Sequence, residues 1–154
     1  MPLLTESAEP MSTPQGDPAT VSVGDGVILK ALAEWQPESG DGLALQVDDE
    51  PSGDFARAPL ITINFPTFHD GRGLSLAVLL RTRYDFTGEL RAVGDVHQDL
   101  LHYMRRCGFD SYELPEQRTQ PAADNRQPFA PYSAYYQASA IDPEPAFRRV
   151  ARGR

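Results

Sequence analysis

The sequence has one cysteine, one lysine and no long hydrophobic run, and each shortage excludes a class of protein. With Cys107 alone, the chain has no internal disulfide, no four-cysteine iron–sulfur site and no paired-cysteine zinc site of its own. It contains no stretch of eighteen apolar residues to span a bilayer. The first six residues have neither a basic region nor an apolar core, so no secretory signal is predicted. These features predict a cytoplasmic protein with no membrane partner.

Positive charge is scarce in the first third of the chain. Residues 1–56 contain eleven acids and one base, Lys30, whereas residues 57–154 contain thirteen arginines and eleven acids. Nucleic-acid binding needs a basic face that displaces counterions from several phosphates. Because the arginines alternate with nearly as many carboxylates and the net charge is −8, nucleic acid is disfavoured as a partner.

A chain of 154 residues suits one domain with one core. Four prolines and few apolar residues predict a disordered arm at residues 1–19, and the basic residues 151–154 are typical of a mobile tail. Between them we expect a single α/β domain over residues 20–150. The apolar pieces and glycine turns between Val21 and Trp35 predict a small strand or hairpin extension at its N-terminal end.

The middle of the chain alternates β-branched segments with helix-forming ones. We expect strands at residues 43–47, 61–65, 90–93 and 111–114, and helices at residues 74–84, 95–107 and 132–140. Asp95 and Gln98 have the spacing of a capping box at the start of the second helix. Alternation of strand and helix is typical of parallel βαβ units. The sequence therefore predicts an α/β fold with a four-stranded, mostly parallel sheet and helices on both faces.

Candidate ligand residues follow the second and third predicted strands. Ligands of parallel sheets usually bind where the carboxyl ends of the strands meet. That edge would carry the loop Asp70-Gly71-Arg72-Gly73 and, after the next strand, Asp95. Two helix N-termini would point amide donors at it, and Arg72 could clamp a small oxyanion such as sulfite or sulfate. The alternative is structural, because Asp70 and Asp95 are also good helix caps.

Arg91 is a further candidate for anion binding, since it lies in the strand that leads to the same edge. An arginine inside a strand is more often the partner of a carboxylate. Glu89 and Asp95 are the nearest carboxylates in sequence, and a salt bridge with either of them is the alternative interpretation.

No standard cofactor, metal or nucleophile motif accompanies this edge. The glycine loop at residues 71–73 has Leu76 where a dinucleotide-binding fingerprint needs its third glycine. His97 and His102 are five residues apart, which does not place them on one helix face as a metal pair. Cys107 falls on the apolar stripe of its helix and should be a buried thiol. We predict no metal site, and the catalytic residues are unknown.

Two long segments and one short one carry a family resemblance. Residues 65–75, 88–96 and 106–110 resemble the bacterial domain-of-unknown-function family 934, and the similarity covers about residues 43–149. Proteins of this family are commonly labelled probable oxidoreductases involved in sulfite reduction. The resemblance therefore implies a place beside sulfite reductase or other sulfate-assimilation enzymes, which are the expected partners. The chain departs from the family at His97, where an aliphatic residue is usual, and in its proline-rich residues 120–131, where a helix is expected.

The family label requires a redox centre that the residues do not reveal. The sequence has no cysteine pair and no complete nucleotide motif. We therefore expect an accessory protein of assimilatory sulfate or sulfite reduction that binds a small anion or a partner protein without a redox centre of its own. The alternative is an oxidoreductase in sulfite reduction that uses a bound flavin or nicotinamide. Self-association stays open.

Overall fold

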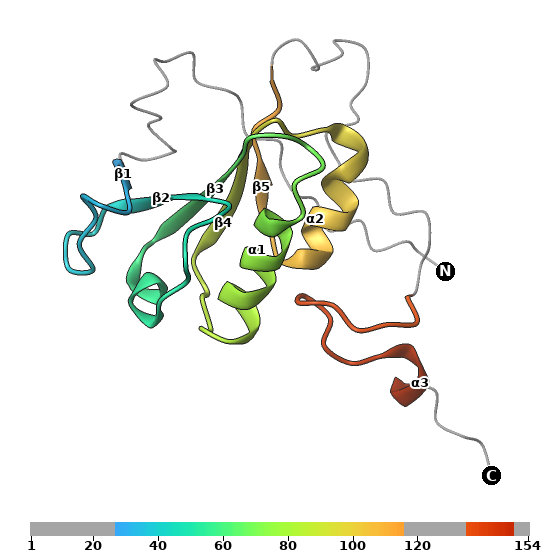
Figure 1. The fold of residues 1–154 in the computed structure, drawn as a ribbon. Helices are drawn as coiled ribbons and strands as arrows, with labels where there is room; N and C mark the ends of the chain where they lie inside the picture. The colour runs from blue at the N-terminus through green and yellow to red at the C-terminus, as the bar shows by residue number, and fades with distance from the viewer. Residues whose placement is uncertain (1–26, 116–134, 150–154) are drawn as a thin grey trace.

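The computed structural model describes residues 27–115 and 135–149, and an α/β fold built on a parallel sheet occupies most of them (Figure 1). The strands are β1 (Leu29–Ala31), β2 (Gly42–Gln46), β3 (Leu60–Phe65), β4 (Glu89–Gly94) and β5 (Ser111–Tyr112). The helices are α1 (Arg72–Thr82), α2 (Leu101–Cys107) and the short α3 (Ala146–Arg149). Two 3₁₀ turns, η1 (Gly53–Arg57) and η2 (Gln98–Leu100), complete the elements.

The five strands lie in chain order, and every neighbouring pair is parallel. Right-handed crossovers that always step in the same direction place their helices on the same face of a sheet. Accordingly, α1 and α2 contact one another on one face (Figure 1). The predicted α/β class and parallel sheet are confirmed. The expectation of helices on both faces was wrong for the described residues, because the strand order never reverses.

The sheet has five strands, and not the predicted four, because the expected N-terminal extension joins it. Leu29 pairs with Gly42 and Ala31 with Ala44, in parallel register. The extension is therefore an edge strand, not a hairpin.

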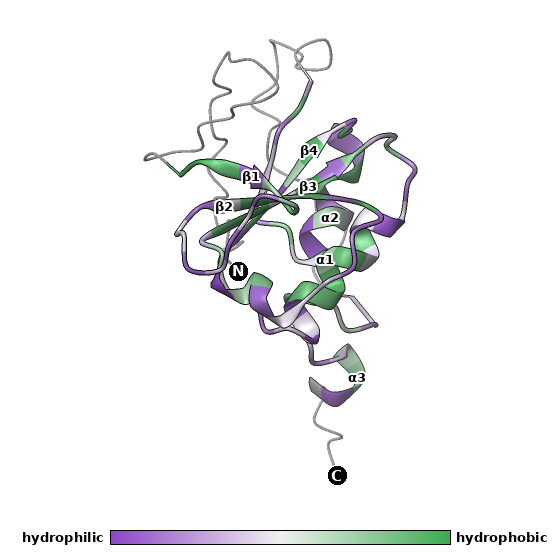
Figure 2. Cartoon of the chain, turned by 60° about the vertical axis from the view of Figure 1, so that its left-hand side comes forward, coloured by the Kyte–Doolittle hydropathy of each residue, from purple (hydrophilic) through white to green (hydrophobic). Residues whose placement is uncertain are grey.

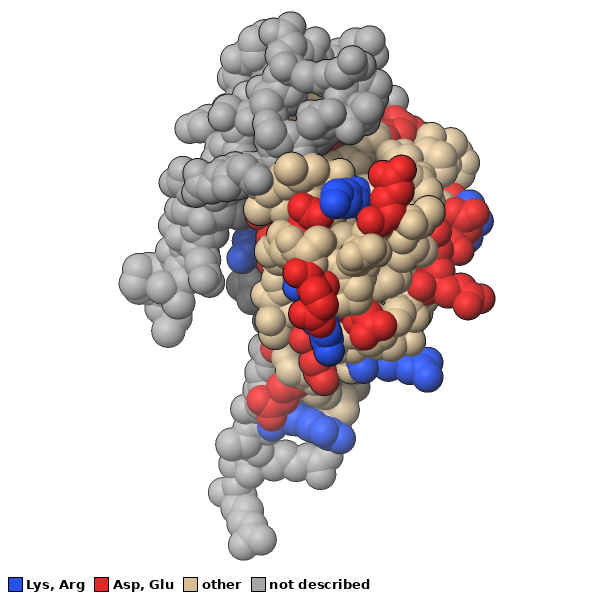
Figure 3. Space-filling view, turned by 90° about the vertical axis from the view of Figure 1, so that its left-hand side faces the viewer, with Lys and Arg blue, Asp and Glu red and all other residues tan. Residues whose placement is uncertain are grey.

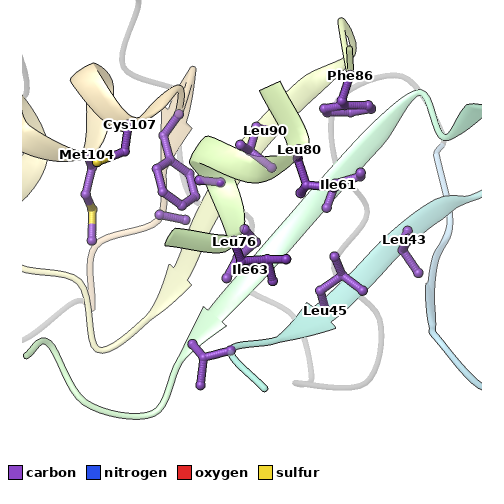
Figure 4. Packing of buried hydrophobic residues seen from close by; sticks show 14 of the residues in the cluster. Leu43, Leu45, Ile61, Ile63, Leu76, Leu80, Phe86, Leu90, Met104 and Cys107 are labelled. Carbon is purple, nitrogen blue, oxygen red and sulfur yellow. The ribbon is translucent and has the colours of Figure 1, made fainter. Parts of the chain in front are cut away.

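The hydrophobic core lies between the sheet and the two helices. Along each strand, alternate side chains point at the helices and are buried: Leu43, Leu45, Ile61, Ile63, Phe65, Leu90 and Ala92. Leu76 and Leu80 of α1, with Met104 and Cys107 of α2, close this layer from the other side (Figure 4). Both the sheet and α2 cover α1. Its residues are accordingly apolar along most of the helix, as the green colour in Figure 2 shows.

The second helix begins later than the sequence predicted. His97 has an extended backbone, the 3₁₀ turn η2 starts at Gln98, and α2 runs only from Leu101 to Cys107. A 3₁₀ turn rotates the chain more per residue than an α-helix does, which shifts the apolar stripe. In a continuous α-helix from Asp95, Tyr103 would share the apolar stripe of Cys107, but in the structure Tyr103 is exposed and Leu101 is buried.

The half-buried Arg81 of α1 joins the loops before β4 and before β5. Its Nε donates to the carbonyl oxygen of Gly108 at 2.9 Å. Its Nη1 donates to the carbonyl oxygens of Phe86 at 2.7 Å and Gly88 at 2.9 Å, and its Nη2 pairs with the carboxylate of Asp110. No local sequence pattern marks this arginine for such a role.

Some expectations fall on other parts of the chain. The predicted arm at residues 1–19 and tail at residues 151–154 lie outside the described residues, as do residues 132–134 of the expected third helix. Residues 135–140 are described and are not helical. None of the helices in the described part of the chain has the length and apolar character needed to cross a membrane.

Candidate functional site

Three loops meet where β2, β3 and β4 end, at the carboxyl-end edge of the parallel sheet. We call residues 47–50, 66–73 and 94–99 the strand-end edge. The ring of Phe68, between β3 and α1, lies 4.2 Å from the ring of His97, measured between centroids. Phe68 also donates its backbone N–H to Oδ2 of Asp95 at 2.9 Å. The structure thus brings the loops after β3 and β4 together, as the parallel fold predicted.

Asp70 and Arg72 bind one another at the start of α1. The Nε and Nη2 atoms of Arg72 donate to Oδ1 and Oδ2 of Asp70 at 3.0 and 2.7 Å, and the backbone N–H of Arg72 also donates to Oδ1, at 3.1 Å. The hydrogen bond from Arg72 lowers the pKa of Asp70, and the same contact raises the pKa of Arg72. An oxyanion would have to compete with this carboxylate for two donors of the guanidinium.

The two glycines beside Arg72 have different surroundings. A Cβ at Gly71, which caps α1, would meet nothing within 4 Å. A Cβ at Gly73 would lie 2.6 Å from the ring of Phe65 and 3.1 Å from a methyl group of Val47. Gly73 therefore lets α1 pack closely on the sheet, which explains this glycine without a ligand.

Asp95 ties two loops together instead of capping its own helix. Its backbone N–H donates to the carbonyl oxygen of Phe65 at 2.8 Å, and its carboxylate accepts from Phe68. The predicted capping box with Gln98 is therefore wrong, because a loop 27 residues earlier in the chain uses the carboxylate. Asp95 does lie at the strand-end edge, as predicted.

Phe68 is the exposed aromatic residue of this edge, with 44% of its surface accessible. Its ring lies 5.1 Å from that of His69 and covers that of His97. The Nε2 atom of His97 is buried without a hydrogen-bond partner and lies 3.6 Å from Oδ1 of Asp95. Within residues 27–115 and 135–149, no three His, Cys, Asp or Glu side chains gather as metal ligands. The sequence analysis gave Phe68 no role, although an aromatic residue in a strand-to-helix loop was a usable signal.

Carboxylates outnumber cations around Phe68. The acids of the strand-end edge are Asp48, Asp49, Glu50, Asp70, Asp95 and Asp99. Figure 3, which looks at the β1 side of the molecule, shows Asp and Glu side chains spread over that face with Lys and Arg side chains interspersed among them. The six carboxylates of the strand-end edge repel sulfite or sulfate and attract a positively charged partner.

Arg91 lies away from the strand-end edge, on the sheet face opposite α1 and α2. Its Nη2 and Nε donate to Oε1 of Glu89 at 2.6 and 3.2 Å, and its Nε also donates to Oγ of Ser111 at 3.0 Å. Only 6% of Arg91 is exposed. The salt-bridge alternative raised from the sequence, with Glu89 as the carboxylate, is thus confirmed. Of the six candidate residues, the structure groups Asp70 to Gly73 with Asp95 and places Arg91 elsewhere.

Cys107 is a buried thiol, as its place on the helix predicted. Burial raises its pKa, with Arg106 acting weakly in the opposite direction. The thiol therefore stays protonated at neutral pH, and a protonated thiol is a poor nucleophile.

Comparison with known proteins gives one match. A family model described as "Bacterial protein of unknown function (DUF934)" matches residues 42–147. The matched range contains β2 to β5, both core helices and the whole strand-end edge. No curated protein and no solved structure matches the chain.

Proposed function

The chain belongs to the DUF934 family of bacterial proteins, and on this basis we propose that it is a non-catalytic accessory protein of assimilatory sulfate or sulfite reduction that acts by binding another protein. The link to sulfur assimilation rests on the label that proteins of this family commonly carry. The expected partner is sulfite reductase or another enzyme of sulfate assimilation. We also propose a cytoplasmic location, on the sequence features alone.

The observation that carries a binding role is the exposed ring of Phe68 on a loop held by other residues. Asp95 accepts the backbone N–H of this loop, and His97 supports the ring from one side. Aromatic side chains at the centre of an interface often contribute most of the binding free energy. Because the loop is already ordered, little conformational entropy remains to be lost on binding.

The charges at the strand-end edge favour a partner protein over a small anion. Asp70 already occupies two donors of Arg72, and exposed Asp48 and Glu50 add negative charge close by. A basic surface on the partner would be attracted to these carboxylates and would receive Phe68 at the same time. The same carboxylates would repel a free sulfite ion.

Growth on defined sulfur sources tests this proposal. A strain without this protein is expected to grow poorly on sulfate or sulfite and normally on cysteine. The wild-type chain should restore growth, and Phe68→Ala should not, because it removes the exposed ring. Tyr103→Ala removes another exposed aromatic side chain, on α2, and should restore growth fully. Equal growth of the deletion strain on all three sources would contradict the proposed function, and full complementation by Phe68→Ala would exclude this edge as its site.

A thermal-shift series distinguishes the proposal from the two other functions considered. Ligands that bind the native state raise the melting temperature by mass action. We expect sulfite, sulfate, flavins and nicotinamides to leave the melting temperature of the wild-type chain unchanged. A rise with a flavin or a nicotinamide would support the oxidoreductase instead. A rise with sulfite that disappears in Arg72→Ala would support a small-anion site at Arg72.

A further inference from the structure

Residues 135–149, which we call the C-terminal arm, dock on α2 through Tyr135 (Figure 1). The Tyr135 ring stacks on the ring of His102 with centroids 5.3 Å apart, and its hydroxyl hydrogen-bonds with Nε2 of His102. The guanidinium of Arg106 lies 4.1 Å from the centroid of the same Tyr135 ring. Tyr135 therefore contacts two side chains that lie one turn apart on α2.

Backbone hydrogen bonds hold the rest of the arm. The N–H of Ala140 donates to the carbonyl oxygen of Arg106 at 3.1 Å, and Nη2 of Arg106 donates to the carbonyl oxygen of Gln137 at 3.3 Å. Within the arm, the N–H of Ala146 donates to the carbonyl oxygen of Tyr136 at 3.2 Å. The Ala140 N–H therefore reports directly whether the arm is docked on α2.

The surroundings of His102 disfavour a charged imidazole ring. Burial lowers the pKa of His102, and the positive charges of Arg106 and Arg105 lower it further. The Tyr135 ring covers part of the His102 ring, so docking of the arm itself contributes to this burial. An imidazolium can only donate hydrogen bonds, so protonation also removes the acceptor that a neutral ring can offer to the Tyr135 hydroxyl.

The carboxylates of the arm and of the turn before α2 extend into solvent. Asp142 and Glu144 of the arm are exposed, and the side chain of Asp99 is 84% exposed. Water and salt screen exposed charges strongly. A protonated His102 would therefore act mainly against Arg105 and Arg106.

We propose that the C-terminal arm is a pH-sensitive element, which is docked on α2 while His102 is neutral and is released when His102 is protonated. A ring whose pKa is lower in the docked state binds its proton more readily in the released state, so acid shifts the population toward release. Docking is fully favoured above the ordinary pKa of histidine, about 6.5, and is lost as the pH falls through the lowered pKa of His102.

Amide hydrogen exchange of the full-length chain, followed by NMR, tests this inference. The protection factor of the Ala140 N–H should fall at least about threefold between about pH 7.5 and about pH 5, the range in which histidine changes charge. The N–H of Asp110, which donates to the carbonyl oxygen of Leu90 at 2.9 Å, should keep its protection, because it belongs to the core. The ring signals of His102 in the same samples should titrate with the same midpoint as the Ala140 protection.

Substitutions separate His102 from the other groups that titrate in this range. His102→Phe keeps a ring against Tyr135, and His102→Gln keeps a neutral hydrogen-bonding group. Neither side chain titrates, so Ala140 should be as protected at about pH 5 as at about pH 7.5. His69→Gln is the matched control, because His69 lies beside Phe68 at the strand-end edge. It should show the same pH dependence at Ala140 as the wild type.

Several results would overturn the inference. One is constant Ala140 protection across this pH range, and another is a midpoint that differs from that of the His102 ring. A third is a pH-dependent loss that remains in a docked His102→Phe or His102→Gln chain, and a fourth is a loss that extends to Asp110. If neither variant docks at about pH 7.5, the comparison of the two wild-type midpoints decides alone. These measurements do not involve Phe68 or growth, so the proposed function stands or falls separately.

Discussion

Replacing Arg81 by leucine is expected to lower the free energy of unfolding by about 2–4 kcal/mol, because each part-buried acceptor that loses its donor costs about 1–3 kcal/mol. The leucine would leave the carbonyl oxygens of Phe86, Gly88 and Gly108 without the donors that now reach them. It would also leave the carboxylate of Asp110 without its guanidinium. Urea unfolding, followed by circular dichroism, measures the difference.

Arg83 supplies the matched control for this experiment. It lies two residues further along, at the end of α1, and its side chain is exposed, with a cation–π contact to Tyr84 at 5.9 Å. Arg83→Leu should change stability by less than about 0.5 kcal/mol, as surface substitutions usually do. Arg81→Lys should stay well below wild-type stability, because an ammonium group cannot reach four acceptors in a planar fork. Similar losses for Arg81→Leu and Arg83→Leu would show that the Arg81 contacts contribute little.

The strands and the fold class could be predicted because their signals are local. The predicted strands at 43–47, 61–65 and 90–93 differ from β2, β3 and β4 by at most one residue at each end. Alternating β-branched residues and flanking turn residues specify such strands without reference to the rest of the chain. The order of strands is not a local property. A crossover of a given length can step to either side of a strand, so the arrangement with α1 and α2 in contact on one face cannot be read from either crossover alone.

The start of α2 shows why a good local rule failed. Asp95 fits the capping-box spacing, but its carboxylate binds the backbone of Phe68, 27 residues away. The contacts of Arg81 with Gly108 and Asp110 span 27 and 29 residues. Sequence patterns report neighbours within one or two turns of a helix. Partners that far apart become visible only when the sheet brings their loops together.

The sheet topology predicted where the candidate residues lie, but it did not predict which groups they contact. The rule that ligand residues gather at the carboxyl ends of parallel strands placed Asp70, Arg72 and Asp95 at one edge. The sequence left open whether Asp70 and Arg72 would face a ligand or one another, since a spacing of two residues in a loop permits both. In the structure, Arg72 and Asp70 hydrogen-bond to one another. The exposure of Phe68 depends on how the loop turns, which no periodicity encodes.

Replacing Gly94 by alanine is expected to cost about 2–4 kcal/mol, from two effects that act together. Gly94 ends β4 with φ of +90°, a conformation that is strained for a residue with a side chain. A Cβ there would lie 2.4 Å from Oδ1 of Asn64 and 2.5 Å from the carbonyl oxygen of Phe65. Overpacking of this kind typically costs about 1–3 kcal/mol. The backbone has little room to move away, because the N–H of the next residue, Asp95, already binds the same carbonyl oxygen.

Gly71→Ala is the matched control, because Gly71 belongs to the same edge and differs in both respects. Its φ is −66°, and a Cβ would meet nothing within 4 Å. Alanine should therefore be neutral or stabilise the chain by up to about 1 kcal/mol, through the unfolded state alone. Urea unfolding of both variants separates conformational strain at the end of β4 from the general effect of removing a glycine. A Gly94→Ala chain as stable as Gly71→Ala would show that β4 can end without the left-handed turn.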